Sequence, residues 1–220
     1  MEALEHSSGS RQRGHVASLA VASGPARRAI FLDRDGVINV RRSSHVGRWQ
    51  DFVFLPGACG AIRQLSSLGW PIVVATNQAS IGRGLLTESG LARIHTRLVA
   101  RVRQTGGRID LIAHCPHAPE DDCGCRKPRP GLFHTAAAQL NLRLAGSYFI
   151  GDAPGDLAAA QQLGMTFVLV RTGLGARALA ENPALANEAD WVAEDILAAG
   201  RWVIEREGAP VEASRERLTG

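Results

Sequence analysis

The residues with the clearest potential for chemistry lie between positions 115 and 131, where the chain reads CPHAPEDDCGCRKPRPG. This stretch holds three of the chain's 4 cysteines, a histidine between the first two of them, and Lys127, the only lysine in the sequence. Three thiolates and an imidazole can complete a closed tetrahedral zinc shell that leaves no position for a reactive water. A disulfide pair beside an idle histidine is the alternative. We expect a structural zinc ion held by Cys115, His117, Cys123 and Cys125.

A second group is FLDRDGVIN, in which Asp33 and Asp35 follow a short apolar run. Side chains at positions i and i+2 of an extended segment point the same way, so both carboxylates can face one reacting centre. Two close carboxylates repel each other unless a cation or a proton separates their roles. The pair therefore indicates a divalent ion combined with acid–base chemistry. Two solvated aspartates in a turn, with no role in chemistry, would give the same sequence pattern and are the alternative.

Short apolar runs, each ended by polar or glycine residues, are typical of buried parallel strands. The strand candidates are residues 29–32, 71–76, 109–114, 147–151 and 165–170. The helix candidates are residues 58–68, 87–104, 132–140 and 156–163, and Thr87 is a plausible cap of the second. This alternation predicts a doubly wound, mostly parallel α/β sheet that binds its ligand at the carboxyl ends of its strands. That edge would gather Asp33, Asp35, Thr76, Asn77, Lys127 and Asp152.

Residues 39–57 are too many for a plain connection between the first strand and its helix. We expect this segment to form a short hairpin flap over the mouth of the crevice. The flap residues Arg41, Arg42 and Ser44 would then add substrate contacts, with ordinary surface solvation as the alternative.

Composition favours one soluble domain. The chain has 220 residues, 45% of them hydrophobic and 21% charged, and no apolar run approaches the length of about 20 residues that spans a bilayer. We predict one folded domain at 29–204 between flexible extensions at 1–28 and 205–220, a cytoplasmic location, and a monomer. The net charge is +4 with a pI near 9.3, but the arginines are scattered, so nucleic acid is an improbable partner. In a reducing compartment, a cysteine cluster favours metal over disulfides.

Four motifs in sequence order, FLDRDGVIN, VVATNQ, RKP and GDAPGD, resemble those of the haloacid dehalogenase (HAD) superfamily phosphatases. The resemblance covers about residues 29–172. CPHAPEDDCGCRKPRPG is similar to the branch that contains heptose-bisphosphate and histidinol-phosphate phosphatases. The resemblance implies a HAD-like Rossmannoid fold with no large cap domain, and hydrolysis of a phosphate monoester through an aspartyl-phosphate.

The resemblance also implies roles for single residues. Asp33 would be the nucleophile, and Asp35 the acid that protonates the leaving oxygen and then the base that activates water. Mg²⁺ would be held by the Asp33 and Asp152 carboxylates and the Asp35 backbone carbonyl. Lys127 would meet the phosphoryl oxygens as a point charge. Asp156 would orient that lysine or act as an ordinary acid at a helix start.

The remaining implied contacts concern the substrate. Thr76 would hydrogen-bond the phosphoryl group, with Asn77 and Gln78 beside it, and Arg126 would recognise a second anionic or hydroxylated part of the substrate. Two features depart from the branch: Ala79-Ser80 stands where Ser-Gly is usual, and Ala153 stands where lysine is frequent.

The activity expected is magnesium-dependent removal of the 7-phosphate from a heptose 1,7-bisphosphate, a step toward nucleotide-activated heptose and cell-surface glycans. Asn39 and the run SIGRG favour it over histidinol-phosphate hydrolysis. A nucleic-acid 3′-end phosphatase and a zinc-stabilised binding module without catalysis are the other possibilities.

Overall fold

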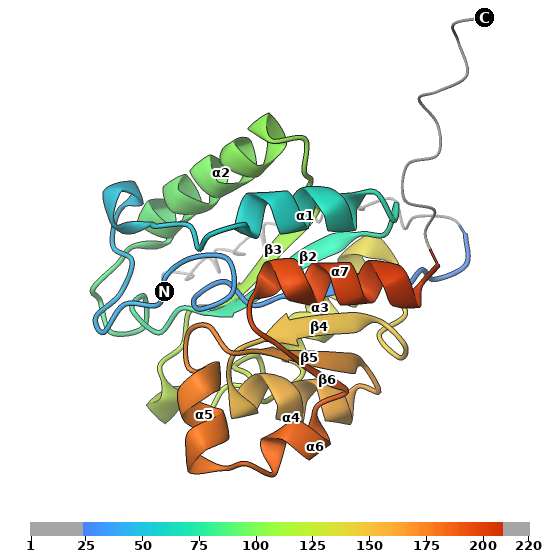
Figure 1. Ribbon diagram of the computed structural model, residues 1–220. Coiled ribbons are helices and arrows are strands. Elements are labelled where there is room, and N and C mark those ends of the chain that lie inside the picture. Colours follow the sequence, from blue (N-terminus) through green and yellow to red (C-terminus); the bar gives the residue numbers. More distant parts are fainter. Residues whose placement is uncertain (1–23, 209–220) are drawn as a thin grey trace, which may run out of the picture.

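The computed structural model describes residues 24–208, and within them all six strands form one parallel sheet with helices on both faces (Figure 1). The spatial order of the strands is β3-β2-β1-β4-β5-β6. The strands are β1 (Ile30–Leu32), β2 (Ile72–Asn77), β3 (Leu111–Cys115), β4 (Tyr148–Gly151), β5 (Thr166–Val170) and β6 (Trp191–Ala193). The order reverses direction at β1, which lies between β2 and β4. Open parallel sheets bind ligands at such a point, outside the carboxyl ends of their strands.

Two apolar layers sandwich the sheet. Ile30 and Leu32 of β1 face the layer that contains α1, α2 and α7, whereas Phe31 faces the layer that contains α3 to α6. All three side chains are fully buried, which explains why β1 reads as a continuous apolar run. The helices are α1 (Ala58–Ser66), α2 (Glu88–Gln104), α3 (Gly131–Leu140), α4 (Pro154–Gln162), α5 (Gly175–Glu181), α6 (Leu185–Glu188) and α7 (Ile196–Arg206).

The sheet predicted from the sequence is confirmed, because all five predicted strands form with ends that differ by one or two residues. Thr87 caps α2 as expected, since its hydroxyl accepts a hydrogen bond of 3.0 Å from the Gly90 N–H. The predicted elements did not include β6, a half-buried edge strand of three residues, or the helices α5, α6 and α7.

The segment 39–57 forms the expected hairpin flap. Asn39 bridges Phe54 in antiparallel fashion, and the Val40 N–H donates a 2.8 Å hydrogen bond to the Val53 carbonyl. Trp49 stacks on Phe52 with ring centroids 5.2 Å apart, which anchors the base of the flap in the α1/α2 layer.

The two expected extensions lie mainly outside the described residues. Arg28 and Glu207, one from each extension, form an ion pair of 2.6 Å, and the hydroxyl of Tyr148 on β4 donates a 2.7 Å hydrogen bond to Glu207. The predicted domain end at residue 204 is two residues too early, because α7 continues to Arg206. No helix within residues 24–208 is both long enough and apolar enough to cross a membrane.

Candidate active site

Side chains from four different strand ends line a cavity of about 230 Å³ at the carboxyl edge of the sheet. Asp33 directly follows β1, Thr76 lies near the end of β2, and Asp152 directly follows β4. Lys127 comes from the long loop between β3 and α3. The lining residues include Asp33, Asp35, Thr76, Asn77, Arg126, Lys127, Asp152 and Asp156. The structure therefore brings together the residues that the sequence assigned to this edge.

Lys127 bridges two carboxylates inside the cavity. Its Nζ lies 2.6 Å from Asp33 Oδ1 and 2.7 Å from Asp156 Oδ1, and the residue is 7% exposed. Burial alone would lower the pKa of Lys127, but the Asp156 and Asp33 carboxylates raise it above its ordinary value. The lysine is therefore a fixed positive charge. Asp156 lies in the first turn of α4 and also holds the lysine, so both expectations for it are met.

Asp33, Asp152 and Asp156 each place a carboxylate oxygen within 4.8 Å of the others. Burial, opposed by Lys127 and reinforced by Asp156 and Asp35, raises the pKa of Asp33 to about 6. Burial and the charges of Asp33 and Asp156 raise the pKa of Asp152 to about 7. One lysine thus fails to neutralise the cluster, and a proton or a further cation is needed.

The oxygens of Asp152 differ in their surroundings. Oδ2 accepts a 2.8 Å hydrogen bond from the Leu174 N–H, whereas Oδ1 is buried with no hydrogen-bond partner among residues 24–208. A Cβ at Gly36 or Gly173 would lie 2.1 or 2.0 Å from Oδ2, so both positions require glycine. A buried, unpaired carboxylate oxygen among other carboxylates suits a hard divalent cation such as Mg²⁺.

Asp35 lines the same cavity, and its carboxylate accepts hydrogen bonds from three side chains. Arg34 donates to its Oδ1 at 3.1 Å and its Oδ2 at 2.8 Å, Asn39 Nδ2 donates to Oδ1 at 2.9 Å, and Gln78 Nε2 donates to Oδ2 at 2.9 Å. Burial would raise the pKa of Asp35, but Arg34 and these hydrogen bonds lower it below its ordinary value. Gln78 Nε2 also donates to Thr76 Oγ1 at 2.9 Å, which couples Asp35 to the end of β2.

Asn77 contacts the backbone of Lys127 in both directions. Its Nδ2 donates to the Lys127 carbonyl at 3.1 Å, and its Oδ1 accepts from the Lys127 N–H at 3.1 Å. The amide therefore ties the end of β2 to the loop that carries the lysine. The expected contact between Asn77 and substrate stays a prediction, because both polar atoms already have protein partners.

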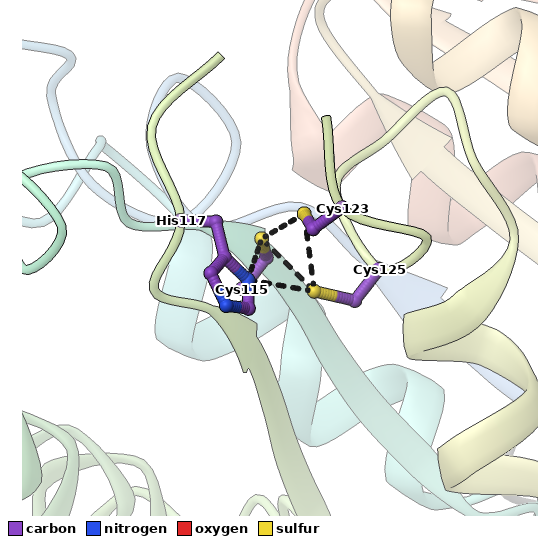
Figure 2. Close-up of side chains that lie close together, drawn as sticks. All are labelled: Cys115, His117, Cys123 and Cys125. Atoms are coloured by element: carbon purple, nitrogen blue, oxygen red, sulfur yellow. Dashed lines mark hydrogen bonds between the residues drawn. The ribbon is translucent and has the colours of Figure 1, made fainter. Parts of the chain in front are cut away.

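Cys115, His117, Cys123 and Cys125 point toward one another above the end of β3 (Figure 2). The Cys125 sulfur lies 3.2 Å from the Cys115 sulfur and 3.4 Å from the Cys123 sulfur, and His117 Nδ1 lies 3.2 Å from it. These separations far exceed the bond length of about 2.05 Å in a disulfide, and all four cysteines are free thiols. The cluster can hold a metal ion, and four soft ligands with this spacing suit a tetrahedral one.

The cysteine cluster connects to the cavity through backbone and side-chain contacts. The Gln78 N–H donates to the Cys115 carbonyl at 2.7 Å, and Arg126 donates to the His117 carbonyl at 3.3 Å. Lys127 follows two residues after Cys125. Pinning this loop therefore fixes both Lys127 and Arg126 relative to β2.

A second cavity of about 390 Å³ adjoins the first and shares Asp35, Arg41, Asn77 and Arg126 with it. The flap forms one wall of this cavity, because Arg41, Arg42 and Ser44 line it. Their contact with substrate stays a prediction. The further lining residues include Arg42, Ser44, Gln78, Ala79, Ser80 and Arg83. Five arginines line it, namely Arg34, Arg41, Arg42, Arg83 and Arg126, and they give this cavity a positive character that suits an anionic ligand.

The sequence reasoning missed three residues of this region: Arg34, His95 and Arg83. Arg34 lies between the two motif aspartates, and no role was predicted for it from the sequence. The structure shows it buried, with 1% of its surface exposed. His95 had no signal in the sequence, because it is one polar position on an amphipathic helix. Arg83 lies in the run SIGRG, which was used to choose between two substrates but not to place a side chain at the cavity.

Comparisons with known proteins agree with this geometry. Residues 124–199 match a family described as HAD-hydrolase-like. D-glycero-β-D-manno-heptose-1,7-bisphosphate 7-phosphatases from Pseudomonas putida and Bordetella bronchiseptica are 41% and 39% identical over 175 and 176 residues. These matches cover 80% of this chain and 98% and 97% of the relatives. A crystal structure of the D,D-heptose 1,7-bisphosphate phosphatase from B. bronchiseptica, complexed with magnesium and phosphate, matches with a TM-score of 0.76 and 38% identity. That match covers 81% of this chain and 99% of the other.

Proposed function

The chain belongs to the D-glycero-β-D-manno-heptose-1,7-bisphosphate 7-phosphatase family of HAD-like hydrolases, and we propose that it removes the 7-phosphate from D-glycero-β-D-manno-heptose 1,7-bisphosphate. The observation that carries the proposal is the convergence of Asp33, Lys127 and Asp152 at one cavity, with Lys127 Nζ 2.6 Å from Asp33. Phosphoryl transfer to an aspartate requires a nucleophilic carboxylate, a cation that binds the phosphoryl oxygens and a carboxylate that can bind a metal ion. Asp33, Lys127 and Asp152 provide these three groups.

In the first half of the reaction, a carboxylate oxygen of Asp33 forms a bond to phosphorus while the bond from phosphorus to the sugar oxygen breaks. The departing oxygen takes the electron pair and receives a proton from Asp35. In the second half, Asp35 removes a proton from water, the water oxygen bonds to phosphorus, and the bond from phosphorus to Asp33 breaks. One acid–base group thus serves both halves.

The lowered pKa of Asp35 in the free protein makes it a carboxylate, whereas the first half needs its acid form. A phosphate dianion beside Asp35 supplies a like charge, and like charges raise the pKa of a carboxyl group. Substrate binding would therefore favour protonation of Asp35, and Asp35 would later donate this proton to the leaving oxygen. Lys127 and the Thr76 hydroxyl would hold the phosphoryl oxygens during the transfer.

Asp33, Asp152 and the Asp35 carbonyl would hold Mg²⁺. When bound, that ion neutralises carboxylate charge and draws electron density from phosphate oxygens. The support from this chain is the buried Oδ1 of Asp152, which has no hydrogen-bond partner among the described residues. Zinc would occupy the cysteine cluster in a structural role, since four protein ligands leave no open position.

A bisphosphate substrate needs a second anion-binding region. The adjoining cavity offers Arg41, Arg42, Arg83 and Arg126. Arginine binds phosphate through two parallel N–H bonds, so these side chains would bind the 1-phosphate while the 7-phosphate lies at Asp33.

The test is phosphate release from a panel in the presence and absence of MgCl₂: the heptose 1,7-bisphosphate, histidinol phosphate, other sugar phosphates and a 3′-phosphorylated oligonucleotide. We expect the heptose bisphosphate to give the highest kcat/KM, only with Mg²⁺. Asp33→Asn should abolish turnover, and Asp110→Asn, at the amino end of the sheet, should not. A preference for histidinol phosphate or the oligonucleotide, or an active Asp33→Asn enzyme, would contradict the proposal.

A cytoplasmic location and a monomeric state remain part of the proposal. Free thiols 3.2–3.5 Å apart support a reducing compartment, in which such groups stay unoxidised. Cell fractionation tests the location, and sedimentation analysis tests the state of association.

A further inference from the structure

Arg34 occupies the position between the two motif aspartates and belongs to none of the proposed chemical steps. It is only 1% exposed and is among the largest fully buried side chains. One terminal nitrogen donates to both oxygens of Asp35, at 3.1 and 2.8 Å, and to Gln78 Oε1 at 3.0 Å. The other lies 3.1 Å from His95 Nε2. The guanidinium thus contacts the acid–base group on one side and α2 on the other.

His95 holds the far side of this guanidinium. It lies on α2 and is 9% exposed. Burial, Arg34 and His114 lower the pKa of His95 to about 3, so the ring is neutral and its Nε2 accepts from Arg34. His114 on the edge strand β3 packs against His95 edge-to-face at 5.8 Å and forms a 3.0 Å contact with Glu88. A chain of side-chain contacts, one of them between two rings, therefore runs from Glu88 on the surface of α2 to Asp35.

This arrangement does little for stability. A buried ion pair loses most of its attraction to desolvation of the two charges. Arg34 Nε is buried with no hydrogen-bond partner among residues 24–208, which adds a further unfavourable contribution. An apolar side chain would fill the same space at lower cost. What an apolar side chain would not provide is a planar fork of donors that fixes the orientation of a carboxylate.

We propose that Arg34 is a positioning residue, which fixes the Asp35 carboxyl group for proton donation to the leaving oxygen, and that His95 holds Arg34 in place from α2. This inference rests on the proposed phosphatase function. The loss of Arg34 should therefore affect some substrates more than others. An ester whose leaving group departs readily as an anion needs no proton from Asp35, so Arg34 contributes little to its hydrolysis. A sugar alkoxide does need the proton.

The experiment compares kcat/KM, which reports the steps up to transfer of phosphate to Asp33, for the heptose bisphosphate and for p-nitrophenyl phosphate. For Arg34→Lys and Arg34→Met, we expect a loss of about 100-fold with the sugar, the size of effect that a misplaced catalytic group produces. The loss with p-nitrophenyl phosphate should be less than about 5-fold, because proton donation contributes little to that substrate.

Two further variants and the wild-type protein separate the outcomes. His95→Gln should lose activity in the same direction by a smaller factor, and it decides the question if both Arg34 variants fail to fold. Arg28→Lys, which alters an ion pair remote from the cavity, should change neither rate. Equal losses with both substrates for the Arg34 and His95 variants would overturn the positioning role. A wild-type protein that hydrolyses neither phosphate would overturn the proposed function instead.

Discussion

Replacing Asp152 by asparagine should make the magnesium-free protein more stable at pH 8 while it abolishes magnesium-dependent activity. Asp152 is fully buried, and burial together with Asp33 and Asp156 raises its pKa to about 7 from 3.8. Each unit of pKa difference corresponds to about 1.4 kcal/mol, so keeping this carboxylate ionised in the folded state costs about 4 kcal/mol. Asparagine keeps the oxygen that accepts from the Leu174 N–H and removes the charge. We expect a gain of about 2–4 kcal/mol in the free energy of unfolding.

The pH dependence of this gain follows from the direction of the shifts. The folded-state pKa values of Asp33 and Asp152, about 6 and about 7, lie above their unfolded value of 3.8. Their proton uptake therefore contributes stability that is fully present below pH 3.8 and is lost as the pH rises through 6 to 7. The advantage of Asp152→Asn should accordingly be largest at pH 8 and should close as the pH falls toward 4.

The assay is thermal unfolding in magnesium-free buffer and again with MgCl₂. For a chain of this length the expected gain corresponds to about 5–15 °C in the unfolding midpoint. Magnesium at 100 times its dissociation constant should add about 2.7 kcal/mol to the wild type and nothing to the variant. Asp190→Asn is the matched control, because Asp190, directly before β6, also accepts a backbone N–H bond, from Phe167 near the amino end of β5. A lower midpoint for Asp152→Asn than for wild type, at pH 8 without magnesium, would refute the repulsion argument.

Three further predictions concern the loop that carries Lys127, the cysteine cluster and the cap of α2. Asn77→Ala should lower kcat about 10–100-fold because it frees the backbone of Lys127, and it should cost far less in a Lys127→Ala background, which a double-mutant cycle measures. Cys125→Ser should release bound zinc, measured by elemental analysis, and lower the unfolding midpoint, whereas Cys59→Ser on α1 should leave the zinc content unchanged. Thr87→Ala should reduce the free energy of unfolding by about 1 kcal/mol in urea titrations without changing kcat, since it removes only the cap of α2.

The sequence predicted the location of the cavity because that location depends on topology alone. Strands that run parallel in one sheet end at the same edge, so polar residues after strands β1, β2 and β4 must meet there. Asp33, Thr76 and Asp152 do so although 119 positions separate the first from the last. Continuous apolar runs mark the strands of a parallel sheet, which is why β1 to β5 could be predicted, including the edge strand β3. The edge strand β6 has only three residues and partial burial, too few to establish a pattern.

Contacts between side chains that lie off the strand ends could not be predicted in this way. Arg34 follows Asp33 in the chain, yet its partner His95 lies 61 residues away on a helix whose polar positions look alike. Asn77 could be assigned to the cavity from its place after β2, but the direction of its amide depends on where the Lys127 backbone passes. Such contacts depend on the path of a loop, and the periodicity of apolar residues in the sequence does not predict that path.

The charges at the cavity explain why the one lysine of the chain lies there. Four carboxylates, those of Asp33, Asp35, Asp152 and Asp156, face the two buried cations Lys127 and Arg34. Arg41 and Arg126 also line the cavity, but the two buried cations alone leave two carboxylates unbalanced, which is the charge of one divalent ion. Lys127 can serve two separate carboxylates, at 2.6 and 2.7 Å, because an ammonium donates in three directions from one point. A planar guanidinium at this position would favour one bidentate partner and leave the other carboxylate unpaired. The single lysine of the chain therefore lies where an arginine would leave one carboxylate without a partner.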